Sequence, residues 1–236
     1  YYFVWQMDMF EVIRALQKLG MSLGEIKEYM ENRSPERFMS MIDGKKRQID
    51  EEIRRLKNMK RFILHEEESV RLAMNTALDE PRLVERDREY LLVSDISAGS
   101  ERKAAVEIAE HVRMQEKYNG AVGAVGSIYL GEDLERGIYD RCVKVYTRLD
   151  KKTVSHRVQN RPEGTYVELY SRGHLWNMEK SYRLITAFAG ERGIRLGKIW
   201  YEDLMLDELT VKDYEQYIVK VMVPVDKALI REYNVK

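Results

Sequence analysis

Glu202 is the residue of this sequence whose surroundings most strongly suggest chemistry. It follows Tyr201 inside the apolar run Ile199–Met205, which has the composition of a β-strand. A carboxylate that faces an apolar interior is costly unless it finds a partner, so a buried glutamate here is either neutral or meets a cation. Strand alternation alone leaves both orientations open, because a glutamate on an edge strand can equally face solvent.

Other groups that often carry catalysis or bind metals are poorly arranged for either task. The four histidines have neither HxH nor HExxH spacing, and the chain contains no GxSxG motif and no phosphate-binding P-loop. Cys142 is the single cysteine, which excludes a cysteine-based metal site and an internal disulfide. We therefore expect no metal ion and no cofactor. The histidines are His65, His111, His156 and His174.

Composition indicates a folded protein of the reducing cytosol. The 236 residues are 44% hydrophobic and 34% charged, and 40 basic residues balance 40 acidic ones. This neutral total carries no signature of a nucleic-acid binder, so we expect any DNA-binding surface to lie outside residues 1–236. The lone cysteine and the lack of an apolar run of about 18 residues predict a cytoplasmic location without a membrane segment. The start at Tyr1 suggests a fragment.

The first 80 residues have the pattern of helices. Apolar residues between Phe10 and Leu19 recur at helical spacing, and Ser22 with Glu25 has the spacing of a capping box that opens a second short helix. Ser34-Pro35-Glu36 is typical of the start of a long helix, and no further proline occurs before Pro81. We expect a remnant of a DNA-binding domain over 1–33 and a long helix over 34–78.

The long helix carries a seam of apolar residues seven positions apart. Charged residues interrupt the second seam position, which predicts a coiled-coil contact that is not fully buried. An alternative is a single helix lying on its own domain. The basic residues between 45 and 61 alternate with acids, which favours a solvated helix face over a DNA contact. The predicted dimerisation residues are Ile42, Ile49, Leu56, Ile63 and Val70.

After Pro81 the pattern changes to short strands and appears twice. The first copy has strands near 90–96, 122–129 and 141–148 with a helix over 100–118, and the second has strands near 165–170, 198–204 and 216–223 with a helix over 176–191. This weak duplication predicts two β-α-β-β halves that share one antiparallel sheet or face each other. The predicted class is α+β, with a domain over 82–225 and a tail over 226–236.

Two stretches carry a resemblance to a known family. The block 19–27, LGMSLGEIK, and its spacing to the long helix resemble the part of a MerR-type transcription factor that follows its winged helix-turn-helix. The segments Trp200-Tyr201-Glu202 and 214–225 look like a gyrase-inhibitor-like effector-binding domain. Together they resemble the multidrug-sensing MerR regulators, which implies a homodimer that acts on promoter DNA and RNA polymerase. The helix-turn-helix is absent from residues 1–236, so the resemblance implies a DNA-binding head that is missing from this chain.

The resemblance also implies a binding pocket for a lipophilic, cationic, aromatic effector. Glu202 would be its anionic floor, and aromatic faces attract cations through their ring quadrupoles. Tyr139 and Tyr217 match aromatic pocket positions, and Met178 falls near another. Each aromatic could equally fill the core, and Met178 could be an adaptable core filler. The remaining candidates match by neighbourhood only and are Tyr129, Tyr166, Tyr170 and Trp176.

The predicted function is that of a ligand-responsive transcriptional regulator and not of an enzyme. Binding of the effector would shift the dimer between two arrangements and so change its action on the promoter. The alternative is a small-molecule hydrolase, because some proteins resembling this domain hydrolyse reactive molecules. Glu202 would then act as a general base toward water. A long coil and MerR-like helices would have no task in such an enzyme.

Overall fold

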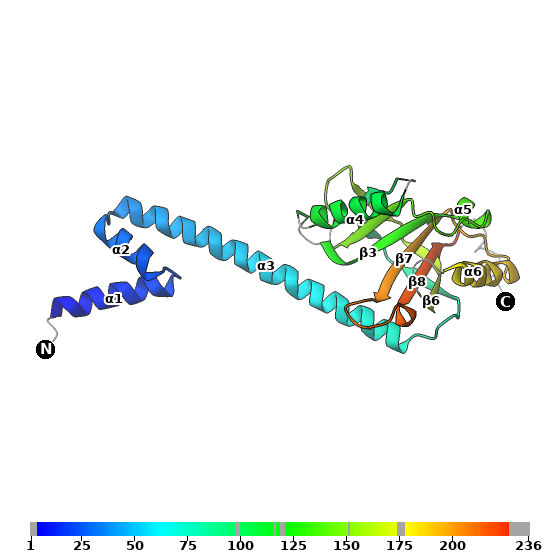
Figure 1. Cartoon of the computed structure of the whole chain (residues 1–236), viewed down its shortest axis with the longest axis horizontal. Helices are drawn as coiled ribbons and strands as arrows, with labels where there is room; N and C mark the ends of the chain where they lie inside the picture. Colours follow the sequence, from blue (N-terminus) through cyan, green and yellow to red (C-terminus); the bar gives the residue numbers. More distant parts are fainter. Residues whose placement is uncertain are drawn as a thin grey trace. The chain divides into compact units, whose positions relative to one another are not determined.

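The computed structural model describes residues 4–97, 100–115, 117–118, 121–150, 152–173 and 178–226, without the side chains of 4–7, 101 and 121–123. The chain forms two compact units, residues 1–57 and 58–236, whose boundary lies inside one long helix. The elements are labelled in Figure 1. Within the described part, none of the helices combines the length and the apolar composition needed to cross a membrane.

The first unit begins with two short helices, α1 (Val4–Lys18) and α2 (Leu23–Glu31). Ser22 and Glu25 form the predicted capping box, in which each side chain accepts a hydrogen bond from the backbone of the other residue. Gly20 has a φ of 75°, a conformation that glycine adopts without strain at the end of α1. Leu16, Met21 and Ile26 form a small core between the two helices.

Helix α3 (Pro35–Asn75) is 41 residues long, close to the predicted range 34–78. Ser34 precedes it and its Oγ accepts a hydrogen bond from the backbone N–H of Arg37 at 3.2 Å. The middle of the predicted seam is exposed, with Ile49, Leu56 and Ile63 each at least half accessible. The boundary of the two units falls within α3, after Lys57.

The second unit is built on one eight-stranded antiparallel sheet in the order β1-β6-β8-β7-β3-β4-β2-β5. This confirms the predicted α+β class with an antiparallel sheet. Helices α4 (Glu101–Gln115), α5 (Gly131–Glu135) and α6 (Glu179–Glu191) accompany it. The strands are β1 (Arg82–Arg86), β2 (Glu89–Asp95), β3 (Ala121–Leu130), β4 (Lys144–Leu149), β5 (Val158–Arg161), β6 (Gly164–Arg172), β7 (Ile199–Leu206) and β8 (Ile218–Pro224).

Two β-α-β-β halves share this sheet, as the duplication predicts. The first half contributes β2, α4, β3 and β4, the second contributes β6, α6, β7 and β8, and they join where β3 pairs with β7. Strands β1 and β5 and the short helix α5 were not predicted. The start of the predicted helix at Trp176 and the predicted tail from 227 onward lie outside the described residues, and α6 begins at Glu179.

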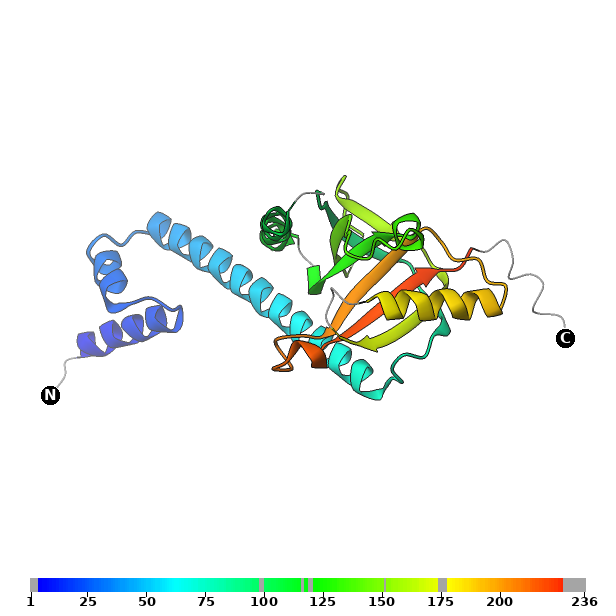
Figure 2. The same cartoon turned by 45° about the vertical axis from the view of Figure 1, so that its right-hand side comes forward.

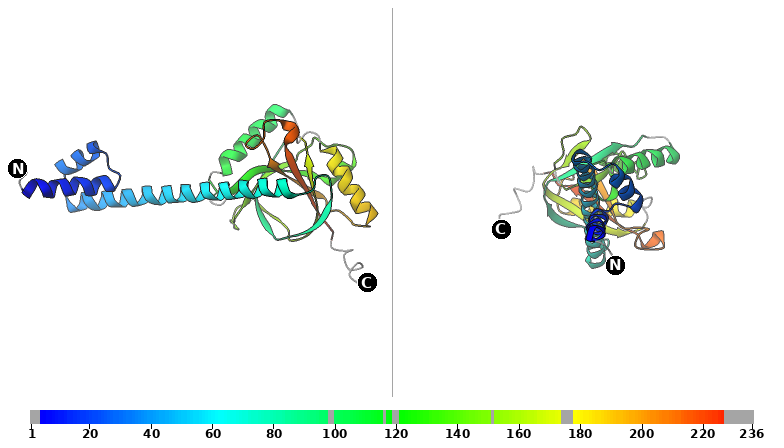
Figure 3. Two further views of the ribbon diagram at one scale, coloured as in Figure 1. Left: turned by 90° about the horizontal axis from the view of Figure 1, so that it is seen from below. Right: turned by 90° about the vertical axis from the view of Figure 1, so that its left-hand side faces the viewer.

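Short connections force the sheet to curl. Strand β1 lies at one edge beside β6, yet only residues 87 and 88 separate it from β2 near the opposite edge. Likewise, β5 pairs with β2 at the second edge and is joined by residues 162 and 163 to β6 near the first edge. A two-residue link cannot cross a flat eight-stranded sheet, since adjacent strands lie about 4.8 Å apart. The two edges therefore approach each other, and Figure 3 shows the strands curving around an interior.

The curl creates an inner and an outer face of the sheet. Tyr166 and Tyr201 lie in a cluster on the inner face, whereas Val167, Trp200 and Val221 pack on the outer face with α6. Figure 2 shows α6 running along the strands of the second half. Helix α4 covers the first half, where buried His111 contacts Ser94 at 2.9 Å and Thr147 at 3.0 Å.

Gly126 in β3 is required where the two halves meet. A Cβ atom at this position would lie 2.4 Å from Cζ of Tyr146 and 2.8 Å from the backbone oxygen of Glu202. The backbone oxygen is part of β7, and Tyr146 is fully buried, so neither contact can be relieved by a flexible side-chain end. The glycine therefore fixes how closely β3 approaches β7 next to Glu202.

We predict that Gly126→Ala lowers the free energy of unfolding by about 1–3 kcal/mol, because it overpacks the joint between the halves. Gly190→Ala is the matched control. Gly190 lies in α6, where an added Cβ atom would meet nothing within 4 Å, so alanine there should stabilise by about 0.5–1 kcal/mol. Urea unfolding followed by circular dichroism measures both changes, and equal effects of the two variants would contradict this reason for Gly126.

Candidate functional site

Glu202 lies on the outer face of β7 and is buried. It pairs across the sheet with Ser127 of β3 and Val221 of β8, so it is central and not on an edge strand. Its residual exposure is 1%, which excludes the solvent-facing alternative. The Tyr182 hydroxyl, from α6, donates a hydrogen bond to Oε1, while Oε2 has no hydrogen-bond partner among the described residues.

The carboxyl of Glu202 is poised between its two protonation states. Burial raises its pKa to about 7, hydrogen-bonding interactions with Tyr182 and Tyr129 lower the pKa, and the neighbouring charge of Asp203 raises it. The Tyr129 hydroxyl is close enough to the carboxyl to lower its pKa, but its position relative to Oε2 does not meet the geometry of a hydrogen bond. Burial in these apolar surroundings costs little for the neutral carboxyl. The ionised form is disfavoured, because one of its oxygens lacks a hydrogen bond and no cation pairs with it among the described residues.

Tyr182, which donates to the carboxyl, is packed among three other aromatic rings. The ring of Tyr182 stacks on Tyr139 with centroids 5.7 Å apart, meets Trp200 edge-on at 5.6 Å and lies 6.0 Å from Tyr129. Burial and the nearby Glu202 also raise the pKa of Tyr182 far above its usual value, so its hydroxyl remains a proton donor. The rings of Tyr182, Tyr139 and Trp200 thus form an aromatic wall of the cavity, and the carboxyl of Glu202 bonds to the Tyr182 hydroxyl outside the lining.

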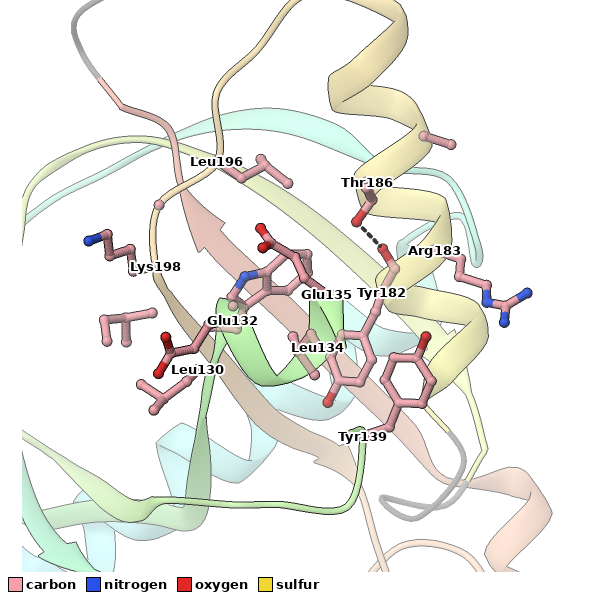
Figure 4. Close-up of a pocket in the computed structure, with 15 residues that line it drawn as sticks. Leu130, Glu132, Leu134, Glu135, Tyr139, Tyr182, Arg183, Thr186, Leu196 and Lys198 are labelled. Atoms are coloured by element: carbon pink, nitrogen blue, oxygen red, sulfur yellow. Dashed lines mark hydrogen bonds between the residues drawn. The ribbon is translucent and has the colours of Figure 1, made fainter. Parts of the chain in front are cut away.

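A cavity of about 1000 Å³ opens on the other side of Tyr182. Figure 4 shows Tyr182 and Tyr139 side by side at its floor, with Leu134 and Leu196 among the apolar lining residues. Glu202 is not part of the lining, so Tyr182 is the residue that touches both the cavity and the buried carboxyl. The remaining lining residues are Leu130, Gly131, Glu132, Glu135, Arg183, Thr186, Ala187, Gly197, Lys198, Ile199 and Trp200.

The structure brings together only part of the predicted site. Tyr139 lines the cavity, and Tyr129 and Met178 belong to the same outer-face core as Tyr182. Tyr166 and Tyr170 point to the inner face, because even-numbered positions of β6 alternate away from the outer-face residues Val167 and Leu169. They are therefore not near the cavity.

Tyr217 is also separated from Glu202. It precedes β8, four positions before Val221, the partner of Glu202, and its hydroxyl donates to Glu208 at 3.0 Å. An extended strand rises about 3.3 Å per residue, which places Tyr217 toward the opposite end of β8 from the cavity. Trp176 lies outside the described residues.

The sequence prediction missed Tyr182, Trp200 and the charged residues of the cavity wall. Tyr182 lies on a helix at helical spacing from Ile185 and Ala189, a pattern that indicates only a core-facing side. Its role depends on the hydroxyl at the ring tip, which reaches across the layer to β7. Helix α5, which supplies Glu132 and Glu135, is one short turn without a sequence signal.

Comparison with known proteins identifies the first part of the chain. The profile of the family described as "MerR, DNA binding" matches residues 9–65, which cover most of α1, all of α2 and the greater part of α3. This chain is a ligand-responsive, MerR-type transcriptional regulator. The assignment confirms the predicted class and its non-enzymatic character.

The same match corrects one expectation. DNA-binding sequence is present within residues 9–65, so the prediction that the DNA-binding head is missing from this chain is wrong. The neutral charge of the whole chain was misleading, because residues 9–65 contain thirteen basic and nine acidic residues. The net charge of a whole chain averages over units with different functions, whereas binding to nucleic acid depends on a local excess of positive charge.

Several proteins are similar over most of the regulator. The multidrug-efflux transporter 2 regulator of Bacillus subtilis is 27% identical over 228 residues, which are 95% of this chain and 82% of the relative. A structure of an EcmrR–DNA complex covers 96% of this chain and 85% of its own at 16% identity and a TM-score of 0.48. The structure of a hydrolase of Listeria innocua covers 65% of this chain and 95% of its own, at 12% identity and a TM-score of 0.44. Neither structural likeness is close enough to decide function.

We predict that the regulator becomes less stable as pH rises through the range set by Glu202. The pKa of Glu202 is about 7 in the folded protein, above the ordinary value of 4.5, so the folded state binds more protons between these values. The contribution of Glu202 to the free energy of unfolding is therefore complete below pH 4.5. It decreases between pH 4.5 and pH 7, by about 3 kcal/mol at most. Glu202→Gln removes this loss, and its advantage over the natural protein should be larger at pH 8 than at pH 5. Urea titrations at both pH values measure it, and a pH-independent difference would contradict a raised pKa.

Proposed function

We propose that the regulator responds to a lipophilic organic cation with an aromatic surface, which binds in the cavity in front of Tyr182. The observation that carries this proposal is a buried carboxyl with a pKa near 7 and one oxygen without a partner among the described residues, behind an aromatic wall. A cation brought into this environment compensates the ionised carboxylate in a region of low dielectric. Water cannot do the same, because Glu202 is fully buried.

The cavity supports a ligand of drug-like size. Its volume of about 1000 Å³ is at the upper end of typical small-molecule sites, which hold about 300–1,000 Å³. Tyr139 and Tyr182 offer stacking faces, and each cation–π contact contributes about 0.5–2 kcal/mol depending on solvation. The relative from Bacillus subtilis is named as a regulator of a multidrug-efflux transporter, which supports a ligand of drug-like chemistry.

Tyr182 couples occupancy of the cavity to Glu202. Its ring lines the cavity, and its hydroxyl donates to Oε1 of Glu202. A cation that stacks against the ring approaches the carboxyl from the cavity side and favours its ionised form. The roles of Tyr129 and Met178 are to hold this wall, since both pack in the same core.

We infer that the regulator acts as a homodimer through the seam of α3. Ile49, Leu56 and Ile63 leave a row of exposed apolar residues on a helix of 41 residues, with Ile42 and Val70 at its ends. A ligand that binds one dimer arrangement better than another shifts the population between them. That shift would change how the DNA-binding segment acts on promoter DNA and RNA polymerase in the cytoplasm.

Binding of tetraphenylphosphonium tests the ligand class. We predict that its Kd in the natural protein rises about tenfold per pH unit below pH 7, because ligand binding then requires loss of the Glu202 proton. Glu202→Gln should weaken binding and remove the pH dependence, while the neutral analogue triphenylphosphine oxide binds both proteins alike. Isothermal titration calorimetry between pH 5.5 and 8 measures these constants.

Glu208→Gln is the matched control, because Glu208 accepts a hydrogen bond from Tyr217 as Glu202 does from Tyr182. This variant should bind tetraphenylphosphonium as the natural protein does. Unchanged affinity and pH dependence in Glu202→Gln would overturn the role of Glu202, and loss of affinity in Glu208→Gln would move the site to the other end of β8.

The dimer is tested at the centre of the seam. We predict that Leu56→Glu converts a dimer into a monomer, because it places a charge at the middle of an apolar contact. Lys57→Glu introduces the same side chain at the next position, off the seam, and should leave the dimer intact. Sedimentation equilibrium measures both, and a monomeric natural protein or a dimeric Leu56→Glu variant would rule out this interface.

A further inference from the structure

The inner face of the curled sheet carries more cationic than anionic side chains, and two of its cations, Arg161 and Lys220, are buried. Among the described residues, Glu168 binds both Arg82 and Arg86, and Glu89 binds both Arg148 and Arg161. A third carboxylate, Asp203, pairs with Lys220 at 2.7 Å. Five cations thus share three carboxylates on this face. Partial burial makes an unmatched charge costly, so a compensating anion is favoured there.

A cavity of about 70 Å³ lies among these charges, between the sheet and the last turns of α3. Arg86, Arg148 and Lys220 contribute cationic groups to its wall, and His65 and Ser69 line it from α3. Asp203 and Glu68 are the acids of the wall, but Asp203 already pairs with Lys220, and Glu68 is exposed. Three cations, the partly buried carboxylate of Asp203 and the exposed carboxylate of Glu68 therefore line the cavity.

One donor in this wall has no protein partner. Nε of Arg86 is buried and makes no hydrogen bond to any described residue, although the same guanidinium binds Glu168 through Nη2. A buried N–H of a charged group without an acceptor is costly. An anion or a polar solvent molecule in the cavity would provide that acceptor.

The two residues of α3 complete the wall as polar neighbours. Nη2 of Arg148 donates to Nε2 of His65 at 2.9 Å, which leaves the imidazole proton on Nδ1, 3.2 Å from Oγ of Ser69. The Ser69 hydroxyl, which accepts from His65, can then donate its own proton. The wall thus offers N–H and O–H donors from both the sheet and the helix.

We propose that this cavity binds a small monovalent anion of the size of chloride or nitrate. Such an ion is little larger than a water molecule, whose share of liquid volume is about 30 Å³. One charge is the expected valence, because Arg82, one of the five cations, keeps a side-chain exposure of 46% and is partly compensated by solvent. The anion contacts groups of β1, β4 and β8 together with α3, and so stabilises the seating of residues 58–75 of the helix on the sheet.

The test is thermal unfolding in sodium gluconate that is replaced stepwise by sodium chloride at constant ionic strength. Screening is then the same throughout, so only a bound anion produces a saturable change. We expect Tm to rise by about 3 °C when chloride reaches about ten times its Kd. Arg86→Gln should abolish the rise, because it removes one cation and the unpartnered Nε while Arg82 remains bound to Glu168.

Arg82→Gln is the matched control. It also removes one of the two arginines of Glu168, but Arg82 does not line the cavity, so the chloride-dependent rise should persist. Crystals of the natural protein grown in sodium bromide provide a second measurement, in which an anomalous peak beside Arg86 is expected. A Tm independent of chloride, an equal response in Arg86→Gln, or a crystal grown in sodium bromide without an anomalous peak in this cavity would overturn the proposal. Tetraphenylphosphonium binding is unaffected in either case, so the two sites are tested separately.

Discussion

Two consecutive carboxylates on β7, the buried Glu202 and the partly buried Asp203, govern the chemistry of the second unit. Glu202 faces outward into aromatic rings, where burial raises its pKa to about 7. Asp203 faces inward, where burial alone would raise the pKa but Lys220, Arg161 and Arg148 hold it well below its usual range. Strand alternation gives neighbouring acids opposite environments, because α6 covers Glu202 on the outer face while Asp203 lies on the inner face of the curl. Strand β7 therefore carries two different carboxyl groups. Glu202 can accept a cation, whereas the charge of Asp203 is already compensated by basic side chains.

The joint between the two halves keeps these environments apart. Strands β3 and β7 pair beside Glu202, and Gly126 lets Tyr146 pack against the backbone at that point. On the inner face, the Tyr146 hydroxyl donates to Asp203 and extends the charge network toward Arg148 and His65 of α3. Glu202 and the inner network therefore share strand β7. That network, in turn, contacts α3 at His65, the last residue of the matched DNA-binding segment.

Much of the architecture could be predicted because it depends on local patterns. The capping box at Ser22, the proline start of α3 and the two β-α-β-β units each have a short-range sequence signal. Strands β1 and β5 were missed because they are short and mixed in polarity, and their pairing is with strands distant in the chain. The curl follows only once those pairings are known, since it results from two-residue links between opposite edges.

The site was only partly predictable for a similar reason. Glu202 stands out by type, but its orientation depends on Tyr182, which comes from a different element and has no local signal. Tyr166 and Tyr170 lie near the matched motif in sequence. Because side chains alternate along β6, both point to the inner face, whereas Glu202 points to the outer face. The five-cation cluster pairs residues such as Arg161 and Glu89, which are 72 positions apart, so no sequence window contains it.

The most direct test of the account is the titration of the Glu202 carboxyl itself. Carbon-13 NMR of glutamate-labelled protein, with the resonance assigned by its loss in Glu202→Gln, reports the protonation state of this group. The account predicts a pKa near 7 in the free protein and a clear fall of that pKa on saturation with tetraphenylphosphonium. A pKa near the ordinary value for glutamate, or one that does not change with the bound cation, would contradict it.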